Sequence, residues 1–263
     1  MDLGLKGKVA FVAAASQGLG RAVAEELAAE GASLILNSRS SENITAVCDD
    51  INRTTGVEVF PAAADLSNTS QLEAAVGSGF DHFGKIDILI TNVGGPPAGT
   101  FETLRRDAWT DAFQSLLMSV IDLSRLVLPG MKERQWGRIL NVTSISVKQP
   151  VDNLILSNSL RAAVTGFAKT LSNEVAEYGV TVNNILPGYT LTERVEQLAR
   201  SVSDREGVSV DAAKERWESQ IPMKRLGRPD EFAALAAFLV SDRASYITGT
   251  SIPVDGGWIR SLL

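Results

Sequence analysis

The sequence predicts a doubly wound α/β fold, built on a seven-stranded parallel sheet with helices on both faces. Short apolar runs rich in β-branched residues recur along the chain, separated each time by segments of helix length. This is the pattern of a parallel sheet with crossover helices. Several runs are apolar at consecutive positions, as expected for strands that are covered on both faces. A glycine-rich segment joins the first run to the first helix.

The expected strands and helices alternate along the chain. Seven strands are expected: Val9 to Ala13, Ser33 to Asn37, Val57 to Ala62, Ile86 to Thr91, Arg138 to Val142, Thr181 to Leu186 and Ser251 to Val254. Six helices are expected: Leu19 to Glu30, Glu42 to Thr54, Ser70 to Phe83, Arg106 to Met131, Leu154 to Tyr178 and Asp230 to Ser241. Glycine often follows a helix because it readily adopts the left-handed conformation. The glycines expected to mark helix ends are Gly31, Gly56, Gly84 and Gly179.

One segment departs from this alternation. Residues 1–263 are expected to form a single domain, since a doubly wound fold commonly reaches this length. The segment from Thr192 to Pro222 is mostly charged and helical, and it lies between the sixth strand and the last helix. Such an insertion predicts a helical substrate lid at 192–222. Its apolar residues, expected to cover the core or to contact a substrate, are Val195, Leu198, Val202 and Trp217.

The composition favours a small soluble substrate over a macromolecular or membrane partner. Hydrophobic residues make up 44% of the chain and charged residues 21%, which is enough apolar surface for a core. The net charge of −6 argues against nucleic acid or an anionic membrane. The one cysteine, Cys48, is expected to be a buried helical thiol, and a cytoplasmic location follows from a reducing compartment. The one histidine, His82, has no His or Cys neighbour, so no metal site is expected.

The glycine-rich turn after the first strand predicts a dinucleotide site. It runs from Ala13 to Gly20 and leads directly into a helix with apolar periodicity. Small residues let the backbone approach a pyrophosphate, and the free N–H groups and positive dipole of the helix N-terminus stabilise its charge. The residues expected to hold the pyrophosphate are Ser16, Gln17, Gly18, Leu19 and Gly20.

The tip of the second strand predicts which dinucleotide is bound. It reads Asn37-Ser38-Arg39-Ser40, where an acidic residue would select the ribose 2′-hydroxyl of NAD. Arg39 instead offers a bidentate fork for a 2′-phosphate. NADP is therefore expected in preference to NAD, with Ser38 and Arg39 at the adenosine ribose. A solvated arginine in a surface turn is the alternative, because nothing else nearby in the sequence is basic.

Together these motifs resemble those of the short-chain dehydrogenase/reductase family, and the resemblance covers essentially the whole chain. Ala13 to Gly20 is similar to its Thr-Gly-x-x-x-Gly-x-Gly motif, with two alanines in place of the first Thr and Gly. The tail, with Gly227-Arg228-Pro229 and Asp255-Gly256-Gly257, is similar to the branch of 3-oxoacyl-acyl-carrier-protein reductases. The resemblance implies a Rossmann fold and further cofactor contacts at Asp65, Leu66, Asn92, Gly94, Pro187, Gly188, Leu191 and Thr192.

The resemblance fails at the catalytic residues. In this family a tyrosine donates or accepts the proton, a lysine one turn later lowers its pKa, a serine holds the substrate oxygen, and an asparagine supports a proton relay. Ser144 matches the serine, but Ser157 and Arg161 stand at the tyrosine and lysine positions, and Leu116 stands at the asparagine position. A serine hydroxyl is far less acidic than a phenol, and arginine does not give up its proton. We expect Ser144, Ser157 and Arg161 to form the catalytic site, with Arg161 also able to hold a ribose hydroxyl or an anionic substrate.

The identity of the proton donor and the kind of activity stay open at the level of sequence. Tyr189, Lys148 and an ordered water are the candidate donors. The preferred function is an NADP-dependent oxidoreductase of small carbonyl or alcohol substrates with a modified site, forming a homodimer or homotetramer through its two long helices. The alternative is a non-catalytic dinucleotide-binding protein, such as a redox sensor or partner subunit. A lyase or isomerase on the same fold is a third reading.

Overall fold

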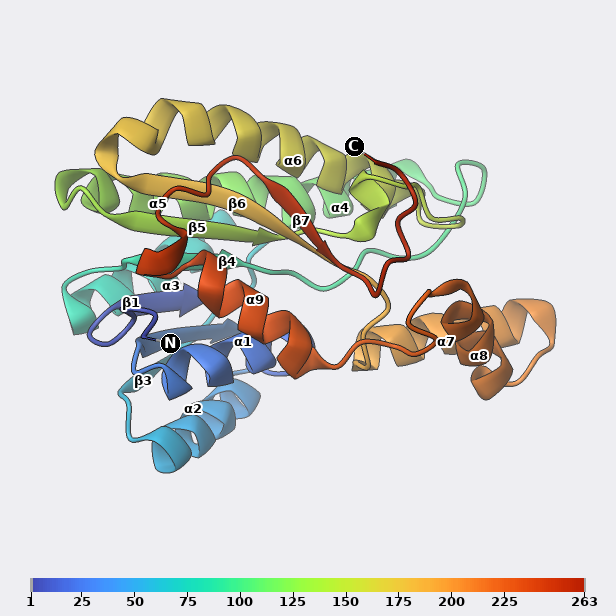
Figure 1. The fold of residues 1–263 in the computed structure, drawn as a ribbon, viewed down its shortest axis with the longest axis horizontal. Coiled ribbons are helices and arrows are strands. Elements are labelled where there is room, and N and C mark those ends of the chain that lie inside the picture. Colours follow the sequence, from blue (N-terminus) through green and yellow to red (C-terminus); the bar gives the residue numbers. More distant parts are fainter. Residues whose placement is uncertain (1, 263) are drawn as a thin grey trace.

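The computed structural model describes residues 2–262, and in these residues seven strands form one parallel sheet in the order β3-β2-β1-β4-β5-β6-β7 (Figure 1). The strands are β1 (Val9–Val12), β2 (Ser33–Ser38), β3 (Val59–Ala63), β4 (Ile88–Thr91), β5 (Gly137–Val142), β6 (Val180–Pro187) and β7 (Ser251–Val254). The predicted fold class is confirmed, and each predicted strand is present with ends that differ by at most two residues. The strand order reverses beside β1, which pairs with β2 on one side and β4 on the other. A ligand crevice is expected at this point.

The helices agree with the predicted ranges, apart from a π-helical turn within one of them and a 3₁₀ turn at the end of another. They are α1 (Gly18–Ala29), α2 (Ser41–Thr55), α3 (Thr69–Phe83), α4 (Arg106–Phe113), α5 (Ser119–Glu133), α6 (Ile155–Val175), α7 (Glu193–Glu206), α8 (Val210–Gln220) and α9 (Pro229–Leu239). The single helix predicted from Arg106 to Met131 was wrong in one respect, because a π-helical turn, η1 (Gln114–Met118), separates α4 from α5. Helix α6 ends at Val175, and a short 3₁₀ turn replaces the predicted last turn to Tyr178.

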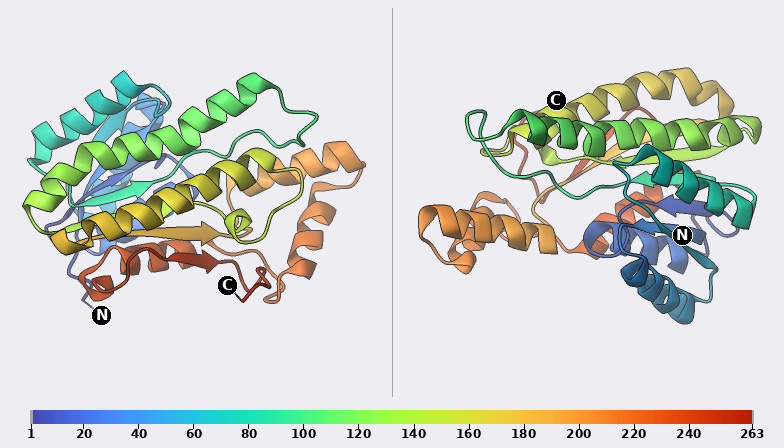
Figure 2. Two further views of the ribbon diagram at one scale, coloured as in Figure 1. Left: turned by 90° about the horizontal axis from the view of Figure 1, so that it is seen from above. Right: turned by 180° about the vertical axis from the view of Figure 1, so that it is seen from behind.

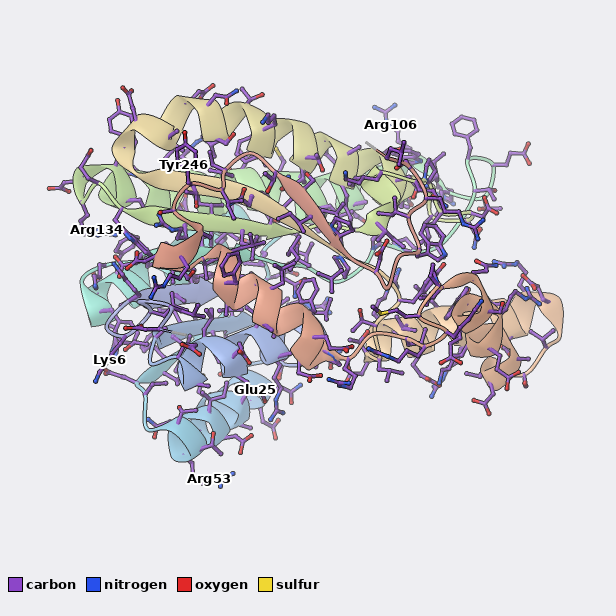
Figure 3. The ribbon with its side chains drawn as sticks, viewed as in Figure 1. Lys6, Glu25, Arg53, Arg106, Arg134 and Tyr246 are labelled. Atoms are coloured by element: carbon purple, nitrogen blue, oxygen red, sulfur yellow. The ribbon has the colours of Figure 1, made fainter. Side chains whose placement is uncertain are left out.

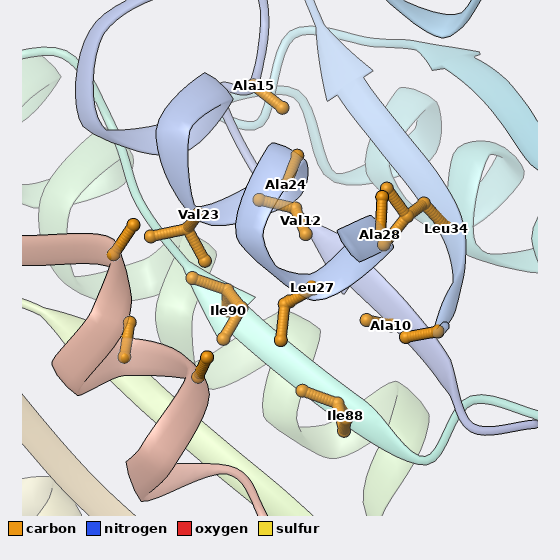
Figure 4. Packing of buried hydrophobic residues seen from close by; sticks show 14 of the residues in the cluster. Ala10, Val12, Ala15, Val23, Ala24, Leu27, Ala28, Leu34, Ile88 and Ile90 are labelled. Carbon is orange, nitrogen blue, oxygen red and sulfur yellow. The ribbon is translucent and has the colours of Figure 1, made fainter. Parts of the chain in front are cut away.

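The helices cover both faces of the sheet, as predicted. On one face α1, α2 and α9 pack against β1, β2 and β4, and Val23 and Leu27 of α1 lie over Val12 and Ile90 (Figure 4). On the other face α3, α5 and α6 lie side by side (Figure 2). Consecutive residues of a strand therefore enter two different cores, which explains why the strands read as continuous apolar runs.

Three of the four predicted glycine helix ends are left-handed caps. Gly56, Gly84 and Gly179 follow their helices or turns with φ of 75°, 71° and 68°. Gly31 also has positive φ, but it lies one residue beyond the α1 cap, Glu30. These glycines end the helices and let the chain turn back toward the sheet.

The one cysteine and the one histidine both take part in packing within the fold. Cys48 is buried in α2, as predicted, and burial raises the pKa of its thiol to about 12. His82 stacks on Phe60 and its Nε2 lies 2.8 Å from Oε1 of Glu58. Charged side chains such as Lys6 and Arg53 lie at the periphery of the molecule (Figure 3).

One helical stretch among the described residues, Arg106–Glu133, is long and apolar enough to cross a membrane by length and composition alone. Its apolar residues Leu123, Val127 and Met131 are buried against the sheet. These apolar residues therefore cover the sheet.

Residues 192–222 form the two helices α7 and α8, which project from the body of the molecule beyond the carboxyl ends of the strands (Figure 1). Ion pairs join them: Glu196 with Lys214, and Glu206 with Arg216. Val195 is buried with Ile221 at their base. The predicted helical character of this segment is confirmed.

Candidate cofactor-binding and active site

The glycine-rich turn brings the N-terminus of α1 to the crevice beside β1. Helix α1 begins at Gly18, and its N-cap residue, Gln17, provides no side-chain hydrogen bond to the first turn. The first N–H groups of α1 therefore stay available to an anionic ligand. A Cβ on Gly20 would collide with the carbonyl oxygen of Ala14, so only glycine fits at that position. These features fit the pyrophosphate of a dinucleotide.

Two asparagine side chains brace this turn from neighbouring strands. Asn37 donates from Nδ2 to the carbonyl oxygens of Ala62 and Ala64, and its Oδ1 lies 3.5 Å from the backbone nitrogen of Ala14. Asn92 donates from Nδ2 to the carbonyl oxygen of Ala14 at 3.5 Å. Ala14 itself has a φ of 49°, an unusual conformation for alanine that these contacts help to fix. Sequence reasoning assigned no role to Asn37, because its role depends on pairing between β2 and β3.

The expected adenosine end of the crevice is formed by the tips of β2 and β3. Arg39 is exposed and has no ion-pair partner among residues 2–262, whereas Ser38 is buried and donates its hydroxyl to the carbonyl oxygen of Ser40. Hydrogen bonds from Ser67 lower the pKa of Asp65, with a smaller contribution from the charge of Arg39. The charge of Arg39 therefore acts on the Asp65 carboxylate. Leu66 is buried beside them.

The turn after β6 is held against the last strand. Gly188 donates its N–H to the carbonyl oxygen of Val254, and a Cβ there would lie 2.8 Å from the backbone of Asp255. Leu191 is exposed, and Thr192 caps α7 by accepting a hydrogen bond from the N–H of Val195. A Cβ on Gly18 would lie 3.6 Å from the Thr192 side chain, so the start of α7 faces the glycine-rich turn across the crevice.

Three serines gather at the carboxyl end of β5. Ser144 caps a short 3₁₀ turn and accepts a hydrogen bond from the N–H of Ser146 at 3.1 Å. The hydroxyl of Ser146 lies 3.5 Å from that of Ser157 on α6, and both residues are buried. The predicted Ser144 and Ser157 are thus linked through Ser146, which sequence reasoning missed. The Ser-x-Ser spacing after β5 was the available signal.

Arg161 lies one turn beyond Ser157 and is 8% exposed. Its Nη1 donates to the carbonyl oxygen of Val142 at 2.7 Å. Burial, together with the nearby charge of Arg194, lowers the pKa of Arg161 to about 10, so the guanidinium remains charged at neutral pH. Arg194, which sequence reasoning also missed, donates from Nη2 to the carbonyl oxygen of Pro96 at 2.8 Å.

Leu116 lies in the π-helical turn and is fully enclosed by apolar neighbours, Ala112, Leu156 and Leu160. An asparagine there would support a relay, but a leucine offers no side-chain donor or acceptor. The predicted loss of the relay residue agrees with this apolar environment.

The candidate proton donors differ in their surroundings. Lys148 is exposed. Tyr189 is largely buried, stacked on Trp217 with ring centroids 4.7 Å apart, and burial with the charge of Asp152 raises its pKa to about 12. A phenol with so high a pKa is a poor general acid or base at neutral pH.

A cavity of about 370 Å³ lies beyond the serine cluster, between residues 149–154, α7 and α8. Leu198, Val202 and Trp217 line it together with Tyr189 and Trp258. Three of the apolar residues flagged in the 192–222 segment therefore line the cavity, whereas Val195 is buried in a cluster against which Trp217 also packs. The size and aromatic lining of this cavity suit a small organic ligand.

Comparison with known proteins defines the class of this chain. Residues 13–259 match the model of the enoyl-(acyl carrier protein) reductase family. The chain is 36% identical over 256 residues to the NADPH-dependent reductase BacG of Bacillus subtilis, covering 97% of this chain and 99% of BacG. It is 34% identical over 255 residues to the 3-oxoacyl-[acyl-carrier-protein] reductase FabG of Vibrio cholerae, covering 97% and 98%.

The fold comparison agrees. L-sorbose reductase from Gluconobacter frateurii, solved with NADPH and L-sorbose, superposes with a TM-score of 0.95 at 33% identity, and all of both chains is covered. The chain belongs to the short-chain dehydrogenase/reductase family, in the branch similar to 3-oxoacyl-acyl-carrier-protein reductases. The predicted family and oxidoreductase class are confirmed, and the non-catalytic alternative is not favoured. The NADPH of these relatives agrees with the predicted cofactor.

Proposed function

We propose that this chain is an NADP-dependent reductase of small carbonyl compounds, working without the tyrosine and lysine of its family. The observation that supports this most strongly is the buried Arg161, one helical turn beyond Ser157 and held on the carbonyl oxygen of Val142, two residues before Ser144. A fixed positive charge and hydroxyl donors at one point are what a carbonyl oxygen needs when it becomes negative.

The cofactor is bound by the groups described above. The uncapped first turn of α1, with Gly18 and Gly20, would hold the pyrophosphate, and Arg39 would bind the 2′-phosphate of NADP. Asp65, Leu66, Gly94 and the turn from Pro187 to Thr192 would contact the remaining parts. Asn92 acts by bracing Ala14. When bound, the cofactor supplies the hydride.

The chain's own residues orient the substrate and stabilise its charge. Ser144 and Ser157 donate hydrogen bonds to the substrate carbonyl oxygen, and Ser146 links the two hydroxyls. Arg161 stabilises the negative charge that develops on that oxygen and holds the cofactor ribose. Serine hydroxyls are too weakly acidic to act as a phenol does, so the proton is delivered by solvent.

The rest of the chain forms the surroundings of this chemistry. Helices α7 and α8 serve as the substrate lid at 192–222, and the cavity that they share with residues 149–154 holds the substrate's apolar part. The buried free thiol of Cys48 suits a reducing compartment such as the cytoplasm. We also propose a homodimer or homotetramer in which α4, α5 and α6 pair with a second copy. A monomer at micromolar concentration in sedimentation velocity would contradict that pairing.

The function is tested by separating binding from turnover. The expected result is NADPH binding in calorimetry together with NADPH consumption on a panel of aldehydes, ketones and oxo acids. NADPH binding without turnover in either direction across the panel would instead support a non-catalytic sensor or partner subunit. Failure to bind NADPH would contradict the proposal at its first step.

A further inference from the structure

Two arginine side chains are held near the carboxyl ends of neighbouring strands, Arg161 at the end of β5 and Arg194 against the loop after β4, and neither has a carboxylate partner among residues 2–262. Arg161 comes from α6 and Arg194 from the first turn of α7. Among residues 2–262, the only hydrogen bonds of these guanidiniums go to backbone carbonyl oxygens, those of Val142 and Pro96. These two bonds fix the position of each guanidinium but leave its positive charge unpaired.

The remaining N–H groups of Arg161, those of Nε and Nη2, have no acceptor among residues 2–262. The residue keeps 8% of its surface exposed. Arg194 reaches across the crevice and lies directly against Gly95, where a Cβ would overlap its guanidinium. A glycine at position 95 therefore makes room for this arginine.

The other buried arginine among residues 2–262, Arg138, lies near a carboxylate. Its Nη2 is 3.8 Å from Oδ1 of Asp242. Two partly desolvated cations close to each other are unfavourable without an anion between them. The lowered pKa values of Arg161 and Arg194, both caused first by burial, agree with this missing anion.

The cofactor's own anionic groups are accommodated elsewhere. The pyrophosphate belongs at Gly18 and the 2′-phosphate at Arg39, on the β1–β2 side of the sheet. Arg161 is anchored on Val142, two residues before Ser144, so an anion bound at Arg161 lies at the same end of β5 as the serine cluster. The anion therefore belongs to the substrate.

We propose that Arg194, together with Arg161, binds the carboxylate of the substrate, which makes the substrate a 2-oxo or 3-oxo acid. This rests on the proposed function. The reaction would take a hydride from NADPH to the carbonyl carbon and a proton from solvent to its oxygen, giving a hydroxy acid and NADP⁺ with the carboxylate unchanged. Guanidinium forks match carboxylates in shape and charge, which sets the acid apart from its neutral ester.

The test compares matched acids and esters on the NADPH-bound protein. The probes are 2-oxo-4-phenylbutanoate and benzoylacetate, each beside its ethyl ester, measured by ternary-complex calorimetry and by kcat/KM. We expect the wild type to prefer at least one acid over its ester by about 100-fold. Arg194→Met should remove that preference by raising KM for the acid, with kcat for the ester and the Kd for NADPH changed less than about threefold. Arg194→Lys should restore part of the preference, because it returns the charge without the fork.

The matched control is Arg200→Met, an exposed position on the same helix that pairs with Glu196. It should keep the acid preference. Wild-type turnover of esters with no preference for either acid would overturn the carboxylate site while leaving the reductase intact. Weaker NADPH binding in Arg194→Met with an unchanged acid preference would also overturn it, because Arg194 would then be a cofactor residue. Absence of NADPH binding in the wild type would contradict the proposed function itself.

Discussion

The two halves of the crevice differ in how their polar groups are used. On the β1–β2 side, Asn37 and Asn92 direct their amides onto backbone groups of the chain and fix the glycine-rich turn. On the β5–β6 side, Arg161 and Arg194 keep unpaired charge, and the buried Thr143 hydroxyl beside Ser144 has no partner in the described chain. In the first half, the side-chain amides are paired within the chain and hold the glycine-rich turn in place. The second half presents polar groups that lack a full set of partners among residues 2–262.

The largest effect is expected from a substitution that disrupts the glycine-rich turn on the β1–β2 side. Gly20→Ala would place a Cβ against the carbonyl oxygen of Ala14, which is backbone and cannot easily move. NADPH affinity should fall by roughly 100-fold or more, and the free energy of unfolding by about 2–4 kcal/mol. Calorimetry and denaturant unfolding measure the two.

The control for that change is Gly77→Ala in α3, where no atom lies within 4 Å of the new Cβ. It should raise the free energy of unfolding by about 0.5–1 kcal/mol, because alanine favours a helix. NADPH binding should be unaffected. Equal losses in the two variants would mean that the close approach at Gly20 is not what shapes the site.

Arg161→Met tests the role of the unpaired positive charge on the β5–β6 side. Because the guanidinium stabilises developing charge, kcat/KM should fall by about 30- to 100-fold. Because it is also a desolvated charge with a single hydrogen bond, its removal should raise the free energy of unfolding by on the order of 1 kcal/mol. Urea unfolding beside steady-state kinetics checks both signs. A variant that loses stability and activity together would make Arg161 a structural residue.

Arg39→Ala sharpens the comparison within the cofactor half. The wild type should bind NADPH at least about tenfold more tightly than NADH, because the exposed guanidinium can pair with the 2′-phosphate. The variant should bind both with similar affinity. Arg53→Ala, an exposed residue of α2 that pairs with Asp50, should keep the preference. A preference that survives in Arg39→Ala would place the selection elsewhere.

The smallest effect is expected at Ala14, which holds a φ of 49° where the family pattern has glycine. Ala14→Gly relieves that conformation but adds freedom to the unfolded chain, so the net gain in the free energy of unfolding should be about 0.5 kcal/mol. A large loss of stability would show that the Ala14 side chain packs in a way that glycine cannot replace.

The sequence predicted what is local and periodic. The strands were predictable because burial on both faces makes each one a continuous apolar run. Ser144, Ser157 and Arg161 were predicted from the resemblance to the family, and their roles stay predictions. The π-helical turn at Gln114 was not predictable, since the apolar spacing continues through it. Arg194 and Ser146 were missed because their roles depend on contacts between α7 and the loop after β4, and between β5 and α6.

The most direct test of a reductase without a phenol and lysine is the pH dependence of kcat/KM. Serine hydroxyls do not titrate, and Arg161, with its pKa lowered by burial to about 10, stays charged, so wild-type activity should be flat from about pH 7 to about pH 9. The double variant Ser157→Tyr with Arg161→Lys should acquire an ionisation within the flat range. A wild-type profile that titrates between those limits, and becomes flat in Tyr189→Phe, would show that a phenol carries the proton after all and would contradict the account.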